Sequence, residues 1–280
     1  MNLDYSDNII EVKNLYKIYT IGENKVRALN GVDFCIKRGE FVAVVGQSGS
    51  GKSTLLNMLA GLEKPTKGQV IIAGEHIENK NEAGLVMFRQ KHVGFIFQSY
   101  NLLQNMDAVE NVAMPLVFRG EDKEIREMKA RRMLKQVGLA KYLDHRPGQM
   151  SGGQQQRVGI ARALVVNPEI IFADEPTGNL DSNTSLEVMH LMQNISRKKN
   201  QTIVMVTHDD YLAGFADKII RILDGKVIDI KINERKDPVE TPKEETPKEE
   251  PKEEPKEQTE EITAEKTDNQ ETAEQENTQA

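Results

Sequence analysis

The sequence predicts an α/β fold whose central sheet is largely parallel and covered on both faces. Three apolar runs, at residues 41–45, 170–173 and 203–206, carry this prediction. Strands that helices cover on both sides lose the usual alternation of apolar and polar residues, so such runs indicate buried parallel strands. Segments with helical spacing separate the runs, which favours strands joined by helical crossovers.

The remaining elements follow in order along the chain. Alternating apolar residues within 9–45, with a turn at 22–24, predict an N-terminal antiparallel β subdomain. The later expected elements are strands at 69–73 and 93–98 and helices at 109–118, 121–137, 152–165 and 186–195. We therefore expect one α/β domain over residues 1–232, with a helical subdomain at about residues 99–165.

The last segment, residues 233–280, has a different composition. It carries 17 acidic and 7 basic residues and repeats the sequence Pro-Lys-Glu-Glu. Few of its residues are apolar, so it is predicted to be disordered. Two roles stay open for it: a solvating, self-repelling extension, or an interaction tail for a basic partner.

Composition excludes several classes of protein. The whole chain has a net charge of −7 and residues 1–232 carry about +3, which is no basis for a nucleic-acid surface. Cys35 is the only cysteine, so a disulfide framework is excluded and a reduced, cytoplasmic setting fits. No signal peptide is recognisable at the N-terminus, and no run approaches the roughly 20 apolar residues of a membrane span. Any action at a membrane is therefore expected to depend on a partner.

A glycine-rich loop follows the strand at 41–45 and opens a helix. Its residues are Gly46, Gln47, Ser48, Gly49, Ser50, Gly51, Lys52, Ser53 and Thr54. Glycines let such a loop aim backbone N–H groups at phosphate oxygens, and the helix N-terminus adds a partial positive charge. Lys52 can reach the β- and γ-phosphates, and the Ser53 hydroxyl can bind Mg²⁺. The spacing therefore predicts a Walker A site for ATP and Mg²⁺.

Two carboxylates follow the strand at 170–173. Asp174 and Glu175 lie where open α/β sheets place their ligands, at the carboxyl end of a parallel strand. Adjacent residues on a strand point in opposite directions, so the two can serve different purposes. We expect Asp174 to hold Mg²⁺ and Glu175 to orient and deprotonate the attacking water.

A second glycine motif opens the helix at 152–165. Its residues are Ser151, Gly152, Gly153 and Gln154. Together with the Walker A loop, this motif makes residues 9–230 resemble the nucleotide-binding subunits of ABC transporters, whose signature it is. Met150 stands where that family usually carries Leu, a nearly isosteric change. The resemblance implies an ABC-type P-loop NTPase fold and a Mg²⁺-dependent ATPase.

The resemblance also implies roles for single residues. Tyr19 matches the aromatic residue that stacks on adenine, and Gln98 matches the glutamine that touches Mg²⁺ and senses the membrane partner. Asp181 belongs to a loop that crosses the dimer interface, and His208 matches the histidine that contacts the γ-phosphate. In this family the signature of one subunit closes over ATP held by the other, which implies a homodimer.

Residues 174–181, 100–103 and 109–116 are similar to one branch of the family, the MacB/LolD/FtsE-like branch. It contains macrolide exporters, lipoprotein-releasing ATPases and the cell-division ATPase that pairs with an FtsX-type permease. The branch implies a peripheral protein on the inner face of the cell membrane, bound to an FtsX/MacB-type permease and acting in export or extraction. The alternatives are a cell-division mechanotransmitter, a soluble ABC protein that acts on DNA or ribosomes, and a nucleotide-binding scaffold without turnover.

Overall fold

The computed structural model describes residues 7–234. The acidic tail predicted at 233–280 lies outside the described residues, apart from its first two positions. The domain boundary at residue 232 and the disorder of the tail therefore stay predictions.

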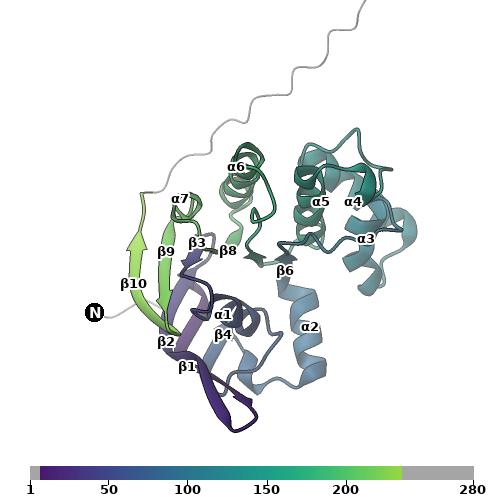
Figure 1. Ribbon diagram of the computed structural model, residues 1–280. Helices are drawn as coiled ribbons and strands as arrows, with labels where there is room; N and C mark the ends of the chain where they lie inside the picture. Colours follow the sequence, from purple (N-terminus) through teal and green to yellow (C-terminus); the bar gives the residue numbers. More distant parts are fainter. Residues whose placement is uncertain (1–6, 235–280) are drawn as a thin grey trace, which may run out of the picture. The chain divides into compact units, whose positions relative to one another are not determined.

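The central sheet has six strands in the order β10-β9-β3-β8-β7-β6 (Figure 1). Their bounds are β3 (Phe41–Val45), β6 (Val93–Ile96), β7 (Ile170–Asp174), β8 (Thr202–Thr207), β9 (Lys218–Leu223) and β10 (Lys226–Ile232). Every pair is parallel except β9 and β10, which form an antiparallel edge. The carboxyl ends of β3, β7 and β8 therefore meet at one edge of the sheet.

The second sheet is antiparallel and has the order β2-β1-β4-β5. Its strands are β1 (Asn8–Ile21), β2 (Asn24–Lys37), β4 (Lys67–Ile72) and β5 (Glu75–His76). The first two form a hairpin whose register pairs Ile21 with Asn24, so the turn comprises residues 22–23 and is one residue shorter than the predicted turn at 22–24. This sheet is the predicted β subdomain, although it also includes β4 and β5 from beyond residue 45.

Helices cover both faces of the central sheet. They are α1 (Lys52–Leu59), α2 (Glu82–His92), α3 (Ala108–Phe118), α4 (Lys123–Gln136), α5 (Gly152–Leu164), α6 (Ser182–Lys199) and α7 (Asp210–Ala213). Figure 1 shows α3, α4 and α5 grouped beyond β6, where α5 packs on that strand. These three helices are the predicted helical subdomain.

Two apolar cores explain why β3 shows no alternation. Phe41, Ala43 and Val45 face the core that is shared with α3–α6, whereas Val42 and Val44 face the core shared with α1 and the antiparallel sheet. All five side chains are buried. Both faces of the strand therefore need apolar residues, as the sequence pattern predicted.

The predicted strands and helices are confirmed, with shifts at their ends. The helix predicted at 186–195 is longer, because Asp181 caps its start and accepts hydrogen bonds from Asn183 N and Thr184 N. The prediction omitted α2, β5, β9, β10 and the short helix α7. Among residues 7–234, no helix is long and apolar enough to cross a membrane.

Candidate functional site

The glycine-rich loop lies between the carboxyl end of β3 and the start of α1. Gly49 and Gly51 have φ angles of 79° and 102°, a region that other residues rarely adopt. A β-carbon at Gly51 would lie 2.3 Å from the carbonyl oxygen of Ala28, whereas one at Gly49 would meet nothing within 4 Å. The loop is therefore packed on β2 at one glycine and open at the other.

The Lys52 side chain is buried beneath this loop, and its Nζ donates to the Gln47 carbonyl at 2.8 Å. Burial lowers the pKa of Lys52, and the charges of Glu175 and Asp174 oppose that shift. The lysine therefore has its ammonium group between the loop and the two carboxylates. A phosphate bound between these groups would contact the Lys52 ammonium group.

Asp174 ends β7 and accepts a hydrogen bond from the Ser53 hydroxyl. Burial and then the charge of Glu175 raise the pKa of Asp174, while Ser53 and Lys52 lower it. A divalent cation would relieve this repulsion between neighbouring carboxylates, and Mg²⁺ prefers hydroxyl and carboxylate oxygens. Ser53 and Asp174 are therefore a suitable pair of Mg²⁺ ligands.

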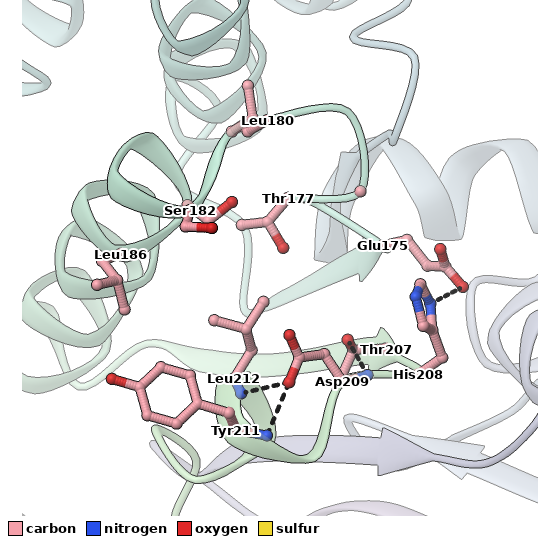
Figure 2. A pocket seen from close by; sticks show the side chains of 12 residues that line it. Glu175, Thr177, Leu180, Ser182, Leu186, Thr207, His208, Asp209, Tyr211 and Leu212 are labelled. Carbon is pink, nitrogen blue, oxygen red and sulfur yellow. Dashed lines mark hydrogen bonds and ion pairs between the residues drawn. The ribbon is translucent and has the colours of Figure 1, made fainter.

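Glu175 follows β7 in an unusual backbone conformation, with a φ angle of 42°. Its N–H donates to the Val206 carbonyl at 3.0 Å, which ties it to β8. Figure 2 shows the His208 ring facing its carboxylate, with Nδ1 3.2 Å from Oε1. Strain of this kind persists where the surroundings enforce it, and it is common at active sites. It holds the Glu175 carboxylate beside His208.

Lys52, Ser53, Glu175 and His208 line one cavity of about 920 Å³, and Asp174 lies behind Ser53, outside the lining. The lining includes Gly46–Gly49 and Gly51–Thr54 of the loop, together with Glu175 and His208. Ser50 is buried and does not line it. The structure thus brings together the Walker A loop, the predicted base and the predicted histidine.

Apart from Val45, which ends β3 just before the loop, sequence reasoning missed five lining residues: Val26, Arg27, Ala28, Asp210 and Arg221. Arg221 of β9 pairs with Asp210 of α7 at 2.7 Å, so these two charges offset each other. The residues come from β2, β9 and α7, and no motif marks them. Only the pairing of β9 with β3 places Arg221 beside the loop, in register with Val45.

Tyr19 lies near the loop but not among the residues that line the cavity. Its hydroxyl donates to Glu63 Oε2 at 2.6 Å, and Lys17 Nζ lies 5.0 Å from the centre of its ring. Burial and then Glu63 raise the pKa of Tyr19, while a hydrogen bond with Thr54 lowers it. The structure therefore brings Tyr19 to the last residue of the loop, and its stacking on adenine stays a prediction.

Gln98 and Asp181 also lie outside the cavity lining. The Gln98 carbonyl accepts a hydrogen bond from Asn179 Nδ2 at 3.0 Å, so the segment after β6 contacts the loop before α6. Asp181 is exposed, and hydrogen bonds from Thr184 lower its pKa. The predicted contacts of Gln98 with Mg²⁺ and of Asp181 with a second subunit stay predictions.

The second glycine motif begins α5. The Ser151 hydroxyl accepts from Gln154 N at 3.3 Å, and Gln154 Oε1 accepts from Ser151 N at 2.9 Å, which together form a capping box. Ser151 is exposed. None of residues 151–154 lines the 920 Å³ cavity in the part of the chain that the structure describes. One chain therefore does not bring its two glycine motifs to one site.

A second, smaller cavity of about 280 Å³ shares Glu175 and His208 with the first (Figure 2). Thr177, Leu180 and Ser182 line it from the loop before α6, and Asp209 and Tyr211 line it from the other side. Asp209 caps α7 by accepting from Tyr211 N at 2.8 Å and Leu212 N at 3.2 Å. Glu175 and His208 thus line both cavities.

Comparison with known proteins agrees with this geometry. The family described as ABC transporter matches residues 29–178. The chain is 49% identical over 222 residues to MJ1508 of Methanocaldococcus jannaschii, an uncharacterized ABC transporter ATP-binding protein, which covers 79% of this chain and 99% of that protein. It is 46% identical to the macrolide export ATP-binding/permease protein MacB of Chlorobium luteolum, but this match covers 84% of the chain and only 34% of MacB.

A solved structure resembles the fold closely. It is the dimeric structure of a post-hydrolysis state of the ATP-binding cassette MJ0796, bound to ADP and Pi. It superimposes with a TM-score of 0.74 at 42% identity and covers 80% of this chain and 98% of that one. That relative is a dimer, and its ligands are the products of ATP hydrolysis.

Proposed function

This chain belongs to the ABC transporter family and is an ATPase of that family, and we propose that two copies of it enclose ATP and drive a membrane permease. Each ATP site would combine the 920 Å³ cavity of one copy with residues 151–154 of the other. Closure would require ATP, and opening would follow hydrolysis. The binding and hydrolysis of ATP would thereby drive a conformational change of the permease.

One observation carries the proposal: the chain has one phosphate loop and one signature motif, and the two do not line a common cavity. Ser151 is exposed at the start of α5, where unpaired N–H groups favour an anion. A second copy related by two-fold symmetry would place that helix end over the first copy's phosphate loop. The dimeric state of MJ0796 supports this arrangement.

The residues that line the cavity and those around it would then divide the chemistry of phosphoryl transfer. Lys52 and the backbone N–H groups of the loop would bind the β- and γ-phosphates, and Ser53 and Asp174 would hold Mg²⁺, assisted by Gln98. When bound, Mg²⁺ neutralises phosphate charge. Glu175 would orient the attacking water and accept its proton, and His208 would donate to the γ-phosphate. Two further roles belong to this proposal: Tyr19 stacking on adenine, and Asp181 linking the two sites.

An exposed apolar surface supports a membrane permease as partner. Val86 and Met87 of α2 and Val117 and Phe118 of α3 are 42–67% exposed, and we call them the α2/α3 surface. Arg119 joins the two helices, because its Nε donates to the Gln90 carbonyl at 3.1 Å. Large apolar side chains gathered on a surface commonly mark a protein interface. This surface would receive a permease of FtsX/MacB type, which would hold the chain at the inner face of the membrane.

The cargo class is the most specific part of the proposal, and a relative supports it. MacB is named as a macrolide export ATP-binding/permease protein. Export or extraction of a drug-like molecule, peptide or lipoprotein is the function that we propose. The second candidate is a cell-division or cell-wall mechanotransmitter, in which the same ATPase moves a permease that carries no cargo.

The partner can be identified by purification from native membranes. Tagged Glu175→Gln protein, with ATP and Mg²⁺, should recover a permease with few membrane spans and a large external domain. Met87→Glu and Phe118→Glu variants should lose that permease. Ile228→Glu should keep it, because Ile228 is also exposed, at 58%, but lies on β10. Recovery of only soluble chains, ribosomes or DNA would overturn the membrane partner and leave the ATPase intact.

A further inference from the structure

The turn after Gln98 is strained at two consecutive residues. Tyr100 and Asn101 have φ angles of 59° and 49°, so both occupy the left-handed region. Asn tolerates this region better than most residues, but Tyr does not. A pair of such residues persists only where its surroundings enforce the conformation.

Backbone hydrogen bonds from Tyr100 N to Phe97 O and from Asn101 N to Ser99 O close this turn, and one side chain holds its carbonyl groups. Arg162 of α5 donates from Nη1 to the Asn101 carbonyl at 2.6 Å and from Nη2 to the Tyr100 carbonyl at 2.7 Å. Both strained residues therefore have their carbonyl groups held by one planar guanidinium group. Lys could not reproduce this contact, because its ammonium group lacks the fork geometry.

The position of Arg162 beside the turn partly desolvates its charged guanidinium group. Burial lowers its pKa, and no carboxylate forms an ion pair with it among residues 7–234. Arg162 is partly buried, and a partly desolvated cation without a carboxylate contributes less to stability than a paired one. Arg157 on the same helix shows the ordinary arrangement, since it bonds the Val137 carbonyl and also pairs with Glu187 at 2.8 Å. The placement of Arg162 is better explained by the turn that it holds than by stability.

The held turn also contacts the signature motif and the loop before α6. A β-carbon at Gly152 would lie 2.9 Å from the Tyr100 hydroxyl, so Gly152 leaves room for that side chain. The same hydroxyl lies 3.5 Å from the carbonyl oxygen of Asn179. Tyr100 therefore lies between the motif that would cover a second copy's ATP and the segment that leads to Asp181.

We propose that Arg162 is a positioning residue for ATP hydrolysis, which holds the Tyr100–Asn101 turn against α5 so that Gln98 and the signature motif move as one body. The turn starts two residues after Gln98, and α5 begins at the signature. The guanidinium therefore links the residue predicted to touch Mg²⁺ with the motif predicted to cover a second copy's ATP. Its effect is on turnover, because neither Arg162 nor the turn lines the cavity where one copy binds ATP. This inference rests on the proposed role of residues 151–154.

The test compares Arg162→Lys with Arg157→Lys, a matched change on the same helix. Arg162→Lys should lower kcat about tenfold or more, as expected when a partly buried charge-assisted hydrogen bond is lost. Its Kd for ATP, measured on the monomer, and its thermal midpoint should stay close to those of Arg157→Lys. Arg162→Met should lower kcat further. A kcat of Arg162→Lys equal to that of Arg157→Lys would overturn the proposal. A loss of ATP affinity in Arg162→Lys as large as its loss of kcat would also overturn it.

A second substitution tests whether the effect passes through the turn. Asn101→Gly, added to Arg162→Lys, should recover part of the lost kcat, because glycine adopts a positive φ without being held. No recovery would contradict an action through this backbone. If the unaltered protein forms no dimer with ATP, the proposed function fails. If it dimerises and Arg162→Lys turns over normally, only the role of Arg162 fails.

Discussion

Two glycines of the phosphate loop should respond differently to the same substitution. Gly49 and Gly51 both have positive φ angles, so alanine at either pays a conformational penalty of about 1–2 kcal/mol. Only Gly51 adds a collision, since its new β-carbon would lie 2.3 Å from the Ala28 carbonyl oxygen. That oxygen belongs to Ala28 of β2, which lies between Arg27 and Leu29, both paired with β1.

The magnitude follows from these two terms. Overpacking against a backbone atom typically costs a further ~1–3 kcal/mol. Gly51→Ala should therefore lower the free energy of unfolding by about 3 kcal/mol, and Gly49→Ala by about 1 kcal/mol.

Urea unfolding of the two variants without nucleotide, with the slope m held in common, measures the difference. Equal losses for the two variants would refute the claim that Gly51 is required by its contact with β2. A larger loss for Gly49→Ala would refute it as well.

Three further results are expected. Burial raises the pKa of Asp174, so the unfolded chain gives up this proton at lower pH than the folded chain does. The folded state therefore loses stability as the pH rises from the unfolded to the folded pKa. Asp174→Asn should raise the thermal midpoint of the nucleotide-free protein at pH 7, with a gain that shrinks as the pH falls and is absent below about pH 4. Arg197 binds Asp217 at 2.5 and 2.8 Å in a nearly buried pair, so Arg197→Met should cost about 3–5 kcal/mol in urea unfolding, and a loss below 1 kcal/mol would contradict this. Glu175→Gln should slow ATP turnover by about 10²–10⁴-fold in a phosphate-release assay while ATP still binds, and unchanged turnover would remove Glu175 as the base.

Much of the fold could be predicted from short-range patterns. The strands at 41–45, 170–173 and 203–206 are buried on both faces, so their composition alone identifies them. Helix α2 was missed for the opposite reason. Its apolar residues 85–88 are consecutive, and two are buried while Val86 and Met87 are exposed. Such a run has no helical period that could be read from the sequence.

The candidate site also contains residues that could be predicted from the sequence and residues that could not. The phosphate loop and Asp174–Glu175 are contiguous in sequence, so their spacing carries their chemistry. Arg221 reaches the cavity only because β9 pairs with β3, a strand far from it in the chain. Arg27 reaches it because β2 packs against the loop at Gly51. The contact between Arg162 and the Tyr100–Asn101 turn spans about 60 residues of sequence and leaves no pattern. Tertiary contacts made by single residues, such as these, cannot be predicted from the sequence alone.

The central claim is that each ATP site is built from two copies, and mixing two inactive variants tests it most directly. Lys52→Ala removes the phosphate-binding cation, and Ser151→Arg blocks the signature. In a mixed dimer, the loop of the Ser151→Arg copy faces the intact signature of the Lys52→Ala copy. An equal mixture should therefore recover up to about a quarter of the unaltered ATPase rate, since about half of the dimers are mixed and each has one complete site. A mixture as inactive as either variant alone would contradict shared sites, as would full activity of Ser151→Arg by itself.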